Sequence, residues 1–205
     1  YKISGRYLGF LIDSILVFIL FGIGVVMISG SGSIFAQQFG MPQYVGIILM
    51  TVLVLIAILS NVERVVKIIA SITPFLIIGV VFLFVYSLAT KDYSFMELDA
   101  LAKEQPSATG HWFTSVSNYV SLAITMGASM TLVMGGDESK ERIASYGGML
   151  GGIGVGILIV IHHLAILAKI DVVGDYDMPS LGLANHISPI FGVIYSVILF
   201  GMIFN

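Results

Sequence analysis

The sequence predicts an all-α membrane protein that crosses the bilayer several times. Six apolar segments, each long enough to span a membrane, occupy most of the 205 residues, and 58% of the residues are hydrophobic whereas 10% are charged. Lipid offers the backbone no hydrogen-bond partner, so a spanning segment must be a helix or belong to a closed barrel. The short alternating strands of a barrel are not seen in the sequence. The expected fold class is therefore a polytopic helical membrane protein.

The six segments are defined by length and by their lack of charge. Each meets the requirement of about 17–25 apolar residues for crossing a hydrocarbon layer of roughly 30 Å. The charged side chains inside the six limits are Asp13 and Lys67, and both lie near the end of a segment. In chain order, the predicted spans are Leu8–Phe35, Tyr44–Ser60, Val65–Ala89, Phe113–Met134, Ile143–Ala168 and Ile187–Asn205.

We expect one transmembrane domain over residues 1–205, with three helices in 8–89, an external loop at 90–112 and three helices in 113–205. The first segment is about twice as long as the hydrophobic part of a signal peptide and has no small-residue cleavage pattern behind it. The chain begins at Tyr1 without an initiator Met and ends at Asn205 inside an apolar run. A fragment of a longer protein, with its last helix truncated, is the expectation.

The distribution of Lys and Arg predicts the orientation in the membrane. If the N-terminal end is cytoplasmic, six basic residues lie inside and three lie outside, as the positive-inside rule requires. The chain has no cysteine, which is compatible with a bacterial inner membrane. We expect a multi-pass protein of the cell membrane whose partners are the lipid bilayer and a small-molecule solute, and no nucleic acid. The inside residues are Lys2, Arg6, Arg64, Lys67, Lys140 and Arg142, and the outside residues are Lys91, Lys103 and Lys169.

The long external loop contains a candidate surface helix. Phe95, Leu98 and Leu101 recur at helical spacing, and Trp112 at the end of the loop is a residue type typical of membrane interfaces. A solvated connector is the favoured interpretation of this loop, and the short surface helix is the alternative.

A polar run interrupts the first predicted span. Within Met27–Ser33, three hydroxyls alternate with two glycines, in a helix that is otherwise rich in branched and aromatic residues. One interpretation is that Ser29, Ser31 and Ser33 line a polar cavity at membrane depth and bind a small solute. The alternative is close packing of small residues against a neighbouring helix. Gln37 and Gln38, just beyond the run, are expected to be interfacial.

A second polar run lies near the centre of the fourth span, from Thr125 to Thr131. Gly127 and Ser129 disfavour the helix most, and a break here would present helix ends to a solute, with Thr131 close by. An intact helix packed through small residues is the alternative.

The fifth span begins with a glycine-rich stretch, 147–156, whose glycines recur at intervals of four residues and favour close helix packing. Further along the same span, His162 and His163 are ionisable groups at depth and are candidates for proton coupling. The alternative is a hydrogen-bonded or interfacial pair without a role in coupling. Asp13 in the first span and Asn205 at the end of the last are further ion-coupling candidates.

Enzyme classes with recognisable membrane motifs are excluded by inspection. The sequence lacks H-E-x-x-H, a Walker A run and a Cys/His metal cluster. Met134 stands where G-x-G-D intramembrane proteases have their first Gly, and the Ser29–Gly32 stretch lacks the leading Gly of the rhomboid G-x-S-G. We therefore predict a protein that is not an enzyme and has no metal or organic cofactor.

Three stretches resemble the YkvI-type membrane proteins: Val26–Pro42, Asn61–Pro74 and Met126–Arg142. That family is related to the amino acid–polyamine–organocation transporters, which share a ten-helix, five-plus-five inverted-repeat fold (LeuT-like). The resemblance implies that the six spans correspond to helices three to eight of that fold. It also implies that the break in the sixth helix falls at Gly127–Ser129.

The resulting functional prediction is a fragment of a secondary active transporter that works by alternating access. The resemblance implies an amino acid or amine as substrate, coupled to a sodium or proton gradient. A non-transporting sensor or assembly subunit with the same fold is the alternative, and a channel is a further one. The predicted substrate site brings together two sets of residues across a midplane cavity: Ser29, Ser31 and Ser33 on one side, and Gly127, Ser129 and Thr131 on the other.

Overall fold

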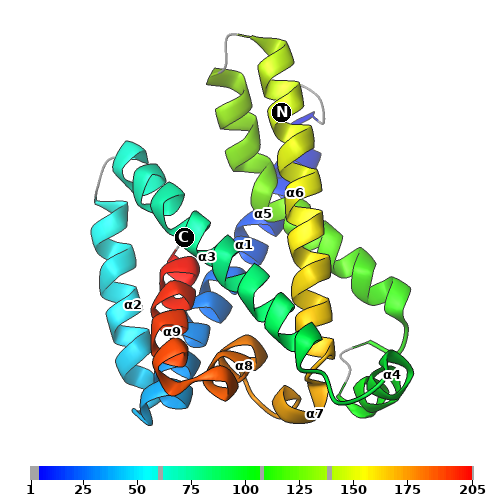
Figure 1. Cartoon of the computed structure of the whole chain (residues 1–205). Helices are drawn as coiled ribbons and strands as arrows, with labels where there is room; N and C mark the ends of the chain where they lie inside the picture. Colours follow the sequence, from blue (N-terminus) through cyan, green and yellow to red (C-terminus); the bar gives the residue numbers. More distant parts are fainter. Residues whose placement is uncertain (1–4, 60–61, 107–108, 138–139, 205) are drawn as a thin grey trace. The chain divides into compact units, whose positions relative to one another are not determined.

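The computed structural model describes the backbone of residues 5–59, 62–106, 109–137 and 140–204. It describes their side chains except those at 62–66, 68–69, 128–130, 132–134 and 137. The described residues form helices and no strand, which confirms the all-helical prediction (Figure 1). The helices are α1 (Gly5–Phe39), α2 (Gln43–Ile58), α3 (Val62–Ala89), α4 (Phe95–Glu104), α5 (Trp112–Asp137), α6 (Glu141–Leu167), α7 (Ile170–Val173), α8 (Pro179–Ile187) and α9 (Pro189–Phe204).

Three described helices are long and apolar enough to cross a membrane by length and composition: Gly5–Phe39, Ala70–Ala89 and Glu141–Leu167. The second and sixth predicted spans form the shorter apolar helices α2 and α9. The fourth predicted span lies within α5, several of whose side chains are outside the described set. A helical membrane protein is thus supported, and six crossings in a LeuT-like arrangement stay a prediction.

The chain divides into two compact units. The first comprises Tyr1–Gly24 and Pro106–Gly156, and the second comprises Val25–Gln105 and Ile157–Asn205. The division falls within α1 and within α6, so each of these helices belongs to both units.

In the first unit, α5 corrects an expectation taken from the family resemblance. The backbone is helical without interruption from Trp112 to Asp137, so the break expected at Gly127–Ser129 is not present. A glycine inside a helix costs only about 1 kcal/mol relative to alanine, which a long helix tolerates. The Thr131 hydroxyl donates a 2.8 Å hydrogen bond to the Gly127 carbonyl, and the Thr125 hydroxyl donates one to Ser121. The Thr125 and Thr131 hydroxyls therefore both bond to their own helix.

The glycine-rich start of α6 also lies in the first unit. A Cβ atom added at Gly147, Gly148, Gly151 or Gly152 would meet no heavy atom within 4 Å, and the same holds for Gly154. In the described part of this unit, α5 therefore does not make the close helix contact that these glycines allow.

In the second unit, α9 is the central helix and packs against α8, α3 and α2. Figure 1 shows α9 running beside α2, with α3 crossing it. The core around it is apolar and fully buried, and glycine permits the close approach of α3. An added Cβ at Gly79 would lie 3.1 Å from the ring of Tyr195, so the ring packs directly on the α3 backbone. Buried members of this core include Ile34, Leu83, Val173, Leu181, Leu183, Tyr195 and Leu199.

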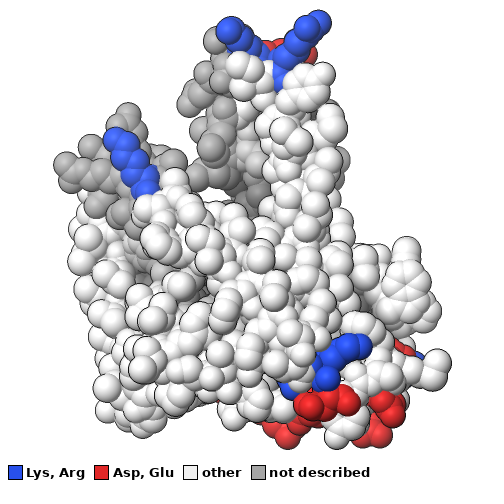
Figure 2. Space-filling view, in the orientation of Figure 1, with Lys and Arg blue, Asp and Glu red and all other residues white. Residues whose placement is uncertain are grey.

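The short helix that the spacing of Phe95, Leu98 and Leu101 allowed is present as α4, so the favoured interpretation of a solvated connector was wrong here. Ser94 and Glu97 form a capping box at its start, in which the Ser94 N–H and hydroxyl both donate to Glu97 Oε2, at 2.8 and 2.7 Å. Leu98 is fully buried, and α4 packs against α7. In the second unit, charged side chains gather over α4 and α7, as Figure 2 shows.

Candidate functional site

Two residues of the polar run in α1, Ser31 and Gly32, make a close contact with α2. Ser31 is fully buried, and its hydroxyl lies 2.6 Å from the Ile28 carbonyl oxygen and 3.1 Å from that of Gly46 on α2. An added Cβ at Gly46 would overlap the Ser31 carbonyl, and one at Gly32 would lie 2.8 Å from the Gln43 carbonyl. Ser31 and Gly32 therefore serve helix packing, one of the two interpretations that the sequence allowed.

The other hydroxyls of this run are more accessible. Ser29 is exposed and Ser33 is half-buried. Gly30 lies between Ser29 and the buried Ser31, and its missing side chain leaves a notch in the surface of α1. An added Cβ at Gly30 would lie 3.3 Å from Met178 Cε and 3.6 Å from Ile203 Cδ1. The notch is thus filled by the Met178 side chain, which belongs to the segment leading into α8.

Two glutamines at the end of α1 bind the α8 segment. Both polar atoms of the Gln37 side-chain amide bind the backbone of Met178. Nε2 donates to the Met178 carbonyl at 3.1 Å, and Oε1 accepts from the Met178 N–H at 3.0 Å. Gln38 Oε1 accepts a 2.8 Å hydrogen bond from Asn185 Nδ2. An added Cβ at Gly192 on α9 would overlap the Asn185 side chain, so the Asn185 amide packs against the α9 backbone. Side-chain amides therefore connect α1, α8 and α9.

A buried cation joins the end of α6 to the loop after α3. The Lys169 ammonium group donates to the Thr90 carbonyl at 2.5 Å and to Asp92 Oδ2 at 2.8 Å. The Lys169 side chain is 4% exposed, whereas that of Asp92 is 71% exposed. Nearby in the same unit, an added Cβ at Gly174 would lie 2.6 Å from Gln105 Nε2, so the end of α4 packs against the turn after α7.

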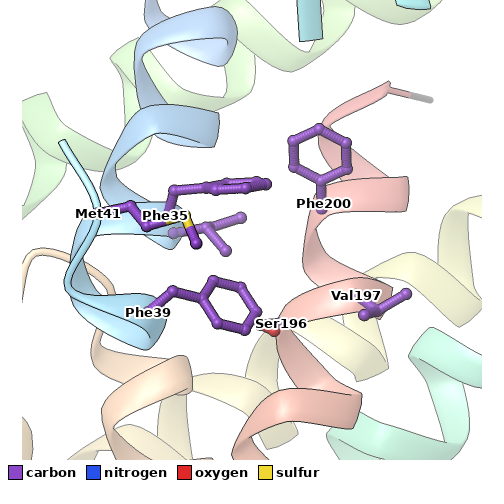
Figure 3. A pocket seen from close by; sticks show the side chains of 7 residues that line it. Phe35, Phe39, Met41, Ser196, Val197 and Phe200 are labelled. Carbon is purple, nitrogen blue, oxygen red and sulfur yellow. The ribbon is translucent and has the colours of Figure 1, made fainter. Parts of the chain in front are cut away.

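An apolar pocket of 240 Å³ lies between the last turns of α1 and α9 (Figure 3). The rings of Phe35, Phe39 and Phe200 point into it, with Met41 at one edge. Ser196, its one polar lining residue, donates its hydroxyl proton to the Val193 carbonyl at 2.7 Å. The pocket therefore offers no free polar group to a ligand. Its lining residues are Ile34, Phe35, Phe39, Met41, Ser196, Val197 and Phe200.

The second half of the predicted substrate site belongs to the first unit. Gly127 and Thr131 lie on α5, where Thr131 is exposed and an added Cβ at Gly127 would meet nothing within 4 Å. The backbone of Ser129 is helical, and its side chain lies outside the described set. The apposition of these residues with Ser29, Ser31 and Ser33 stays a prediction.

The four ion-coupling candidates have different surroundings. Asp13 on α1 and His163 on α6 are exposed. His162 is half-buried, and its Nδ1 atom is buried without a hydrogen-bond partner in the described structure. Asn205 lies outside the described residues. No group of three or more His, Cys, Asp or Glu side chains that could hold a metal ion occurs among the residues that the structure describes.

Comparison with known proteins gives one informative match. The chain is 25% identical over 201 residues to the uncharacterized membrane protein YkvI of Bacillus subtilis (strain 168), and the alignment covers 98% of this chain. It is similar to a bacterial membrane protein. The chain spans 56% of the length of that relative. No protein-family profile matches the chain. No solved structure matches it. The match supports a YkvI-like relationship and a membrane location.

Sequence reasoning missed the residues that bind α8 to α1. Gln37 and Gln38 were expected to be interfacial, and Met178 carried no signal of its own. One signal was present in the sequence: two adjacent amides at the end of a long apolar helix whose other long polar side chain, Arg6, lies at the opposite end. Amides in that position commonly satisfy backbone groups of a neighbouring segment.

Proposed function

We propose that this chain is part of a secondary active transporter that moves a small solute across the membrane by alternating access. By family resemblance, the solute is an amino acid or an amine. The observation that carries the proposal is the run Ser29–Ser33 on an apolar membrane helix. It combines accessible hydroxyls with a glycine notch, and a hydrogen-bonded segment covers the notch.

Several features of the second unit support binding of a neutral or zwitterionic solute. Hydroxyls and carbonyls at membrane depth replace the water that a polar solute loses on entering the protein. Ser29 is exposed and Ser33 is half-buried, so both residues are more accessible than Ser31, whose hydroxyl lies in the contact with α2. We assign solute contact to Ser29 and Ser33, and a structural role to Ser31.

The coupling ion is sodium or a proton. Sodium agrees with the family resemblance and with hydroxyl ligands, because hard cations prefer oxygen. A proton agrees with His162, whose Nδ1 is buried and without a hydrogen-bond partner in the described structure. Measuring whether a sodium gradient or a proton gradient drives uptake distinguishes these two coupling ions.

The test is uptake by the full-length protein in proteoliposomes, with labelled amino acids and small amines under an imposed sodium or proton gradient. We expect saturable accumulation that Ser33→Leu reduces at least about tenfold, because a bulky apolar group removes a hydroxyl and fills its space. Ser14→Leu on the same helix is the matched control. The Ser14 hydroxyl bonds to the Phe10 carbonyl at an exposed position outside the polar run, so uptake should be retained.

Three other outcomes would contradict the proposal. Solute binding without gradient-driven accumulation would indicate a sensor. Conductance that does not saturate would indicate a channel. Equal uptake by Ser33→Leu and Ser14→Leu would show that the polar run does not contact the transported solute.

A further inference from the structure

We propose that Met178 is a plug for the Gly30 notch and that Gln37 is the positioning residue that holds the plug in place. The inference rests on the proposed function, because it assigns a regulatory contact to the same polar run. The plug fills the notch between Ser29 and Ser31, and a solute that contacts Ser29 and Ser33 can enter this notch when Met178 leaves it.

The fit of Met178 into α1 depends on the absence of a side chain at position 30. Met178 Cε lies 3.3 Å from the point where a Cβ would stand, and Ile203 Cδ1 of α9 lies 3.6 Å from it. Both are apolar groups, so the notch beside the hydroxyls is filled by hydrocarbon. Methionine suits a reversible plug because its unbranched side chain can enter and leave a narrow gap by rotamer changes.

Gln37 acts on the backbone of the same residue. Its amide accepts from the Met178 N–H at 3.0 Å and donates to the Met178 carbonyl at 3.1 Å, so it fixes the position and direction of this residue. The Met178 carbonyl also accepts from the Gly182 N–H and begins α8. The turn into α8 and the plug therefore move together.

The contact between Met178 and α1 has the features of a reversible contact and not of a permanently buried core. Met178 is half-buried, and α8 has no side-chain cap at its start. Two hydrogen bonds from one side chain hold Met178, and each can be exchanged for water at small net cost. Asn185, further along α8, has a separate bond to Gln38, so α8 remains anchored to α1 when Met178 is released.

The absence of cysteine from these 205 residues gives a direct test. Met178→Cys is made in the full-length protein, with any cysteine elsewhere replaced by serine, and its reaction rate with a membrane-impermeant maleimide is measured. The substitution keeps the backbone groups that Gln37 holds. We expect Gln37→Leu to raise the labelling rate roughly tenfold, since it removes both hydrogen bonds while keeping the side-chain size.

Gln43→Leu is the matched control, because it makes the same change at an exposed glutamine, at the start of α2. Its labelling rate should equal that of Met178→Cys alone. Gly30→Leu, which fills the notch, should raise the labelling rate even with Gln37 intact. This second variant keeps the test decisive if Gln37→Leu fails to fold.

Equal labelling rates in the Gln37→Leu, Gly30→Leu and Gln43→Leu backgrounds would overturn the plug. Labelling does not depend on transport, so the two proposals fail separately. Faster labelling in a protein without gradient-driven uptake would leave the plug standing and reject the transporter. Gradient-driven uptake by the unmodified protein, together with a labelling rate that no variant changes, would support the transporter and reject the proposed role of Met178.

Discussion

Lys169 is a buried cation whose counter-ion faces water. Its side chain is 4% exposed, and that of its partner Asp92 is 71% exposed. Removing Asp92 would leave the ammonium group buried, with the Thr90 carbonyl as its remaining described acceptor. Removing Lys169 would leave a carboxylate that water solvates. An unpaired buried charge costs far more than an unpaired exposed one, so the two partners of this ion pair are not equivalent.

We therefore expect Asp92→Asn to destabilise the protein more than Lys169→Met does. The expected loss is about 1–2 kcal/mol, below the 3–5 kcal/mol typical of fully buried pairs because Asp92 is largely exposed. The measurement is the free energy of unfolding in detergent. Asp99→Asn is the control: its pair with Lys103 is exposed on both sides, and its loss should lie within about 0.5 kcal/mol. A larger loss for Lys169→Met than for Asp92→Asn would reject the argument.

At the scale of the element, α4 is stabilised at its start by a titratable group. Hydrogen bonds from the side chain and backbone of Ser94 lower the pKa of Glu97 from its ordinary value of 4.5. A carboxyl whose pKa is lowered by folding contributes stability above its unfolded pKa and loses it as the pH falls through the folded value. We expect the first turn of α4 to fray below about pH 4.5.

Amide hydrogen exchange at residues 95–98 as a function of pH measures this fraying. Glu97→Gln is the informative variant, because glutamine can accept the same bonds without titrating. It should abolish the pH dependence and keep the helix, whereas Ser94→Ala should speed exchange roughly fivefold at neutral pH. An unchanged acid response in Glu97→Gln would show that another group causes the fraying.

The elements also show what local sequence can predict. The spacing of Phe95, Leu98 and Leu101 indicated α4 as one of two interpretations, because the periodicity of a short helix is visible in its own sequence. The break expected at Gly127 was wrong, because one glycine costs a helix only about 1 kcal/mol relative to alanine and α5 continues through it. The bonds of Gln37 to Met178 join positions 141 apart in the chain. Periodicity shows which face of a helix is polar and carries no information about the distant segment that covers it.

At the scale of the whole molecule, the basic residues predict which loops lie in the cytoplasm. Six of nine fall on one side if the chain crosses six times with its N-terminal end inside. With this topology, α4 and the α7–α8 segment lie outside, and the turn between α5 and α6 lies inside. The plug described above would then face the external solution, so the topology also decides the side from which a solute reaches the polar run.

Single cysteines test this arrangement, since these 205 residues contain none. In intact cells, we expect Lys103→Cys in α4 to react with an impermeant maleimide. Arg142→Cys at the start of α6 should react only after the membrane is permeabilised. Because α5 lies between these two sites, both results together require that α5 crosses the bilayer. If both cysteines react in intact cells, α5 does not cross the membrane, and the count of six spans and its inverted-repeat interpretation fail together. The reverse pattern would keep the crossings and invert the molecule, which would place the Met178 plug on the cytoplasmic side.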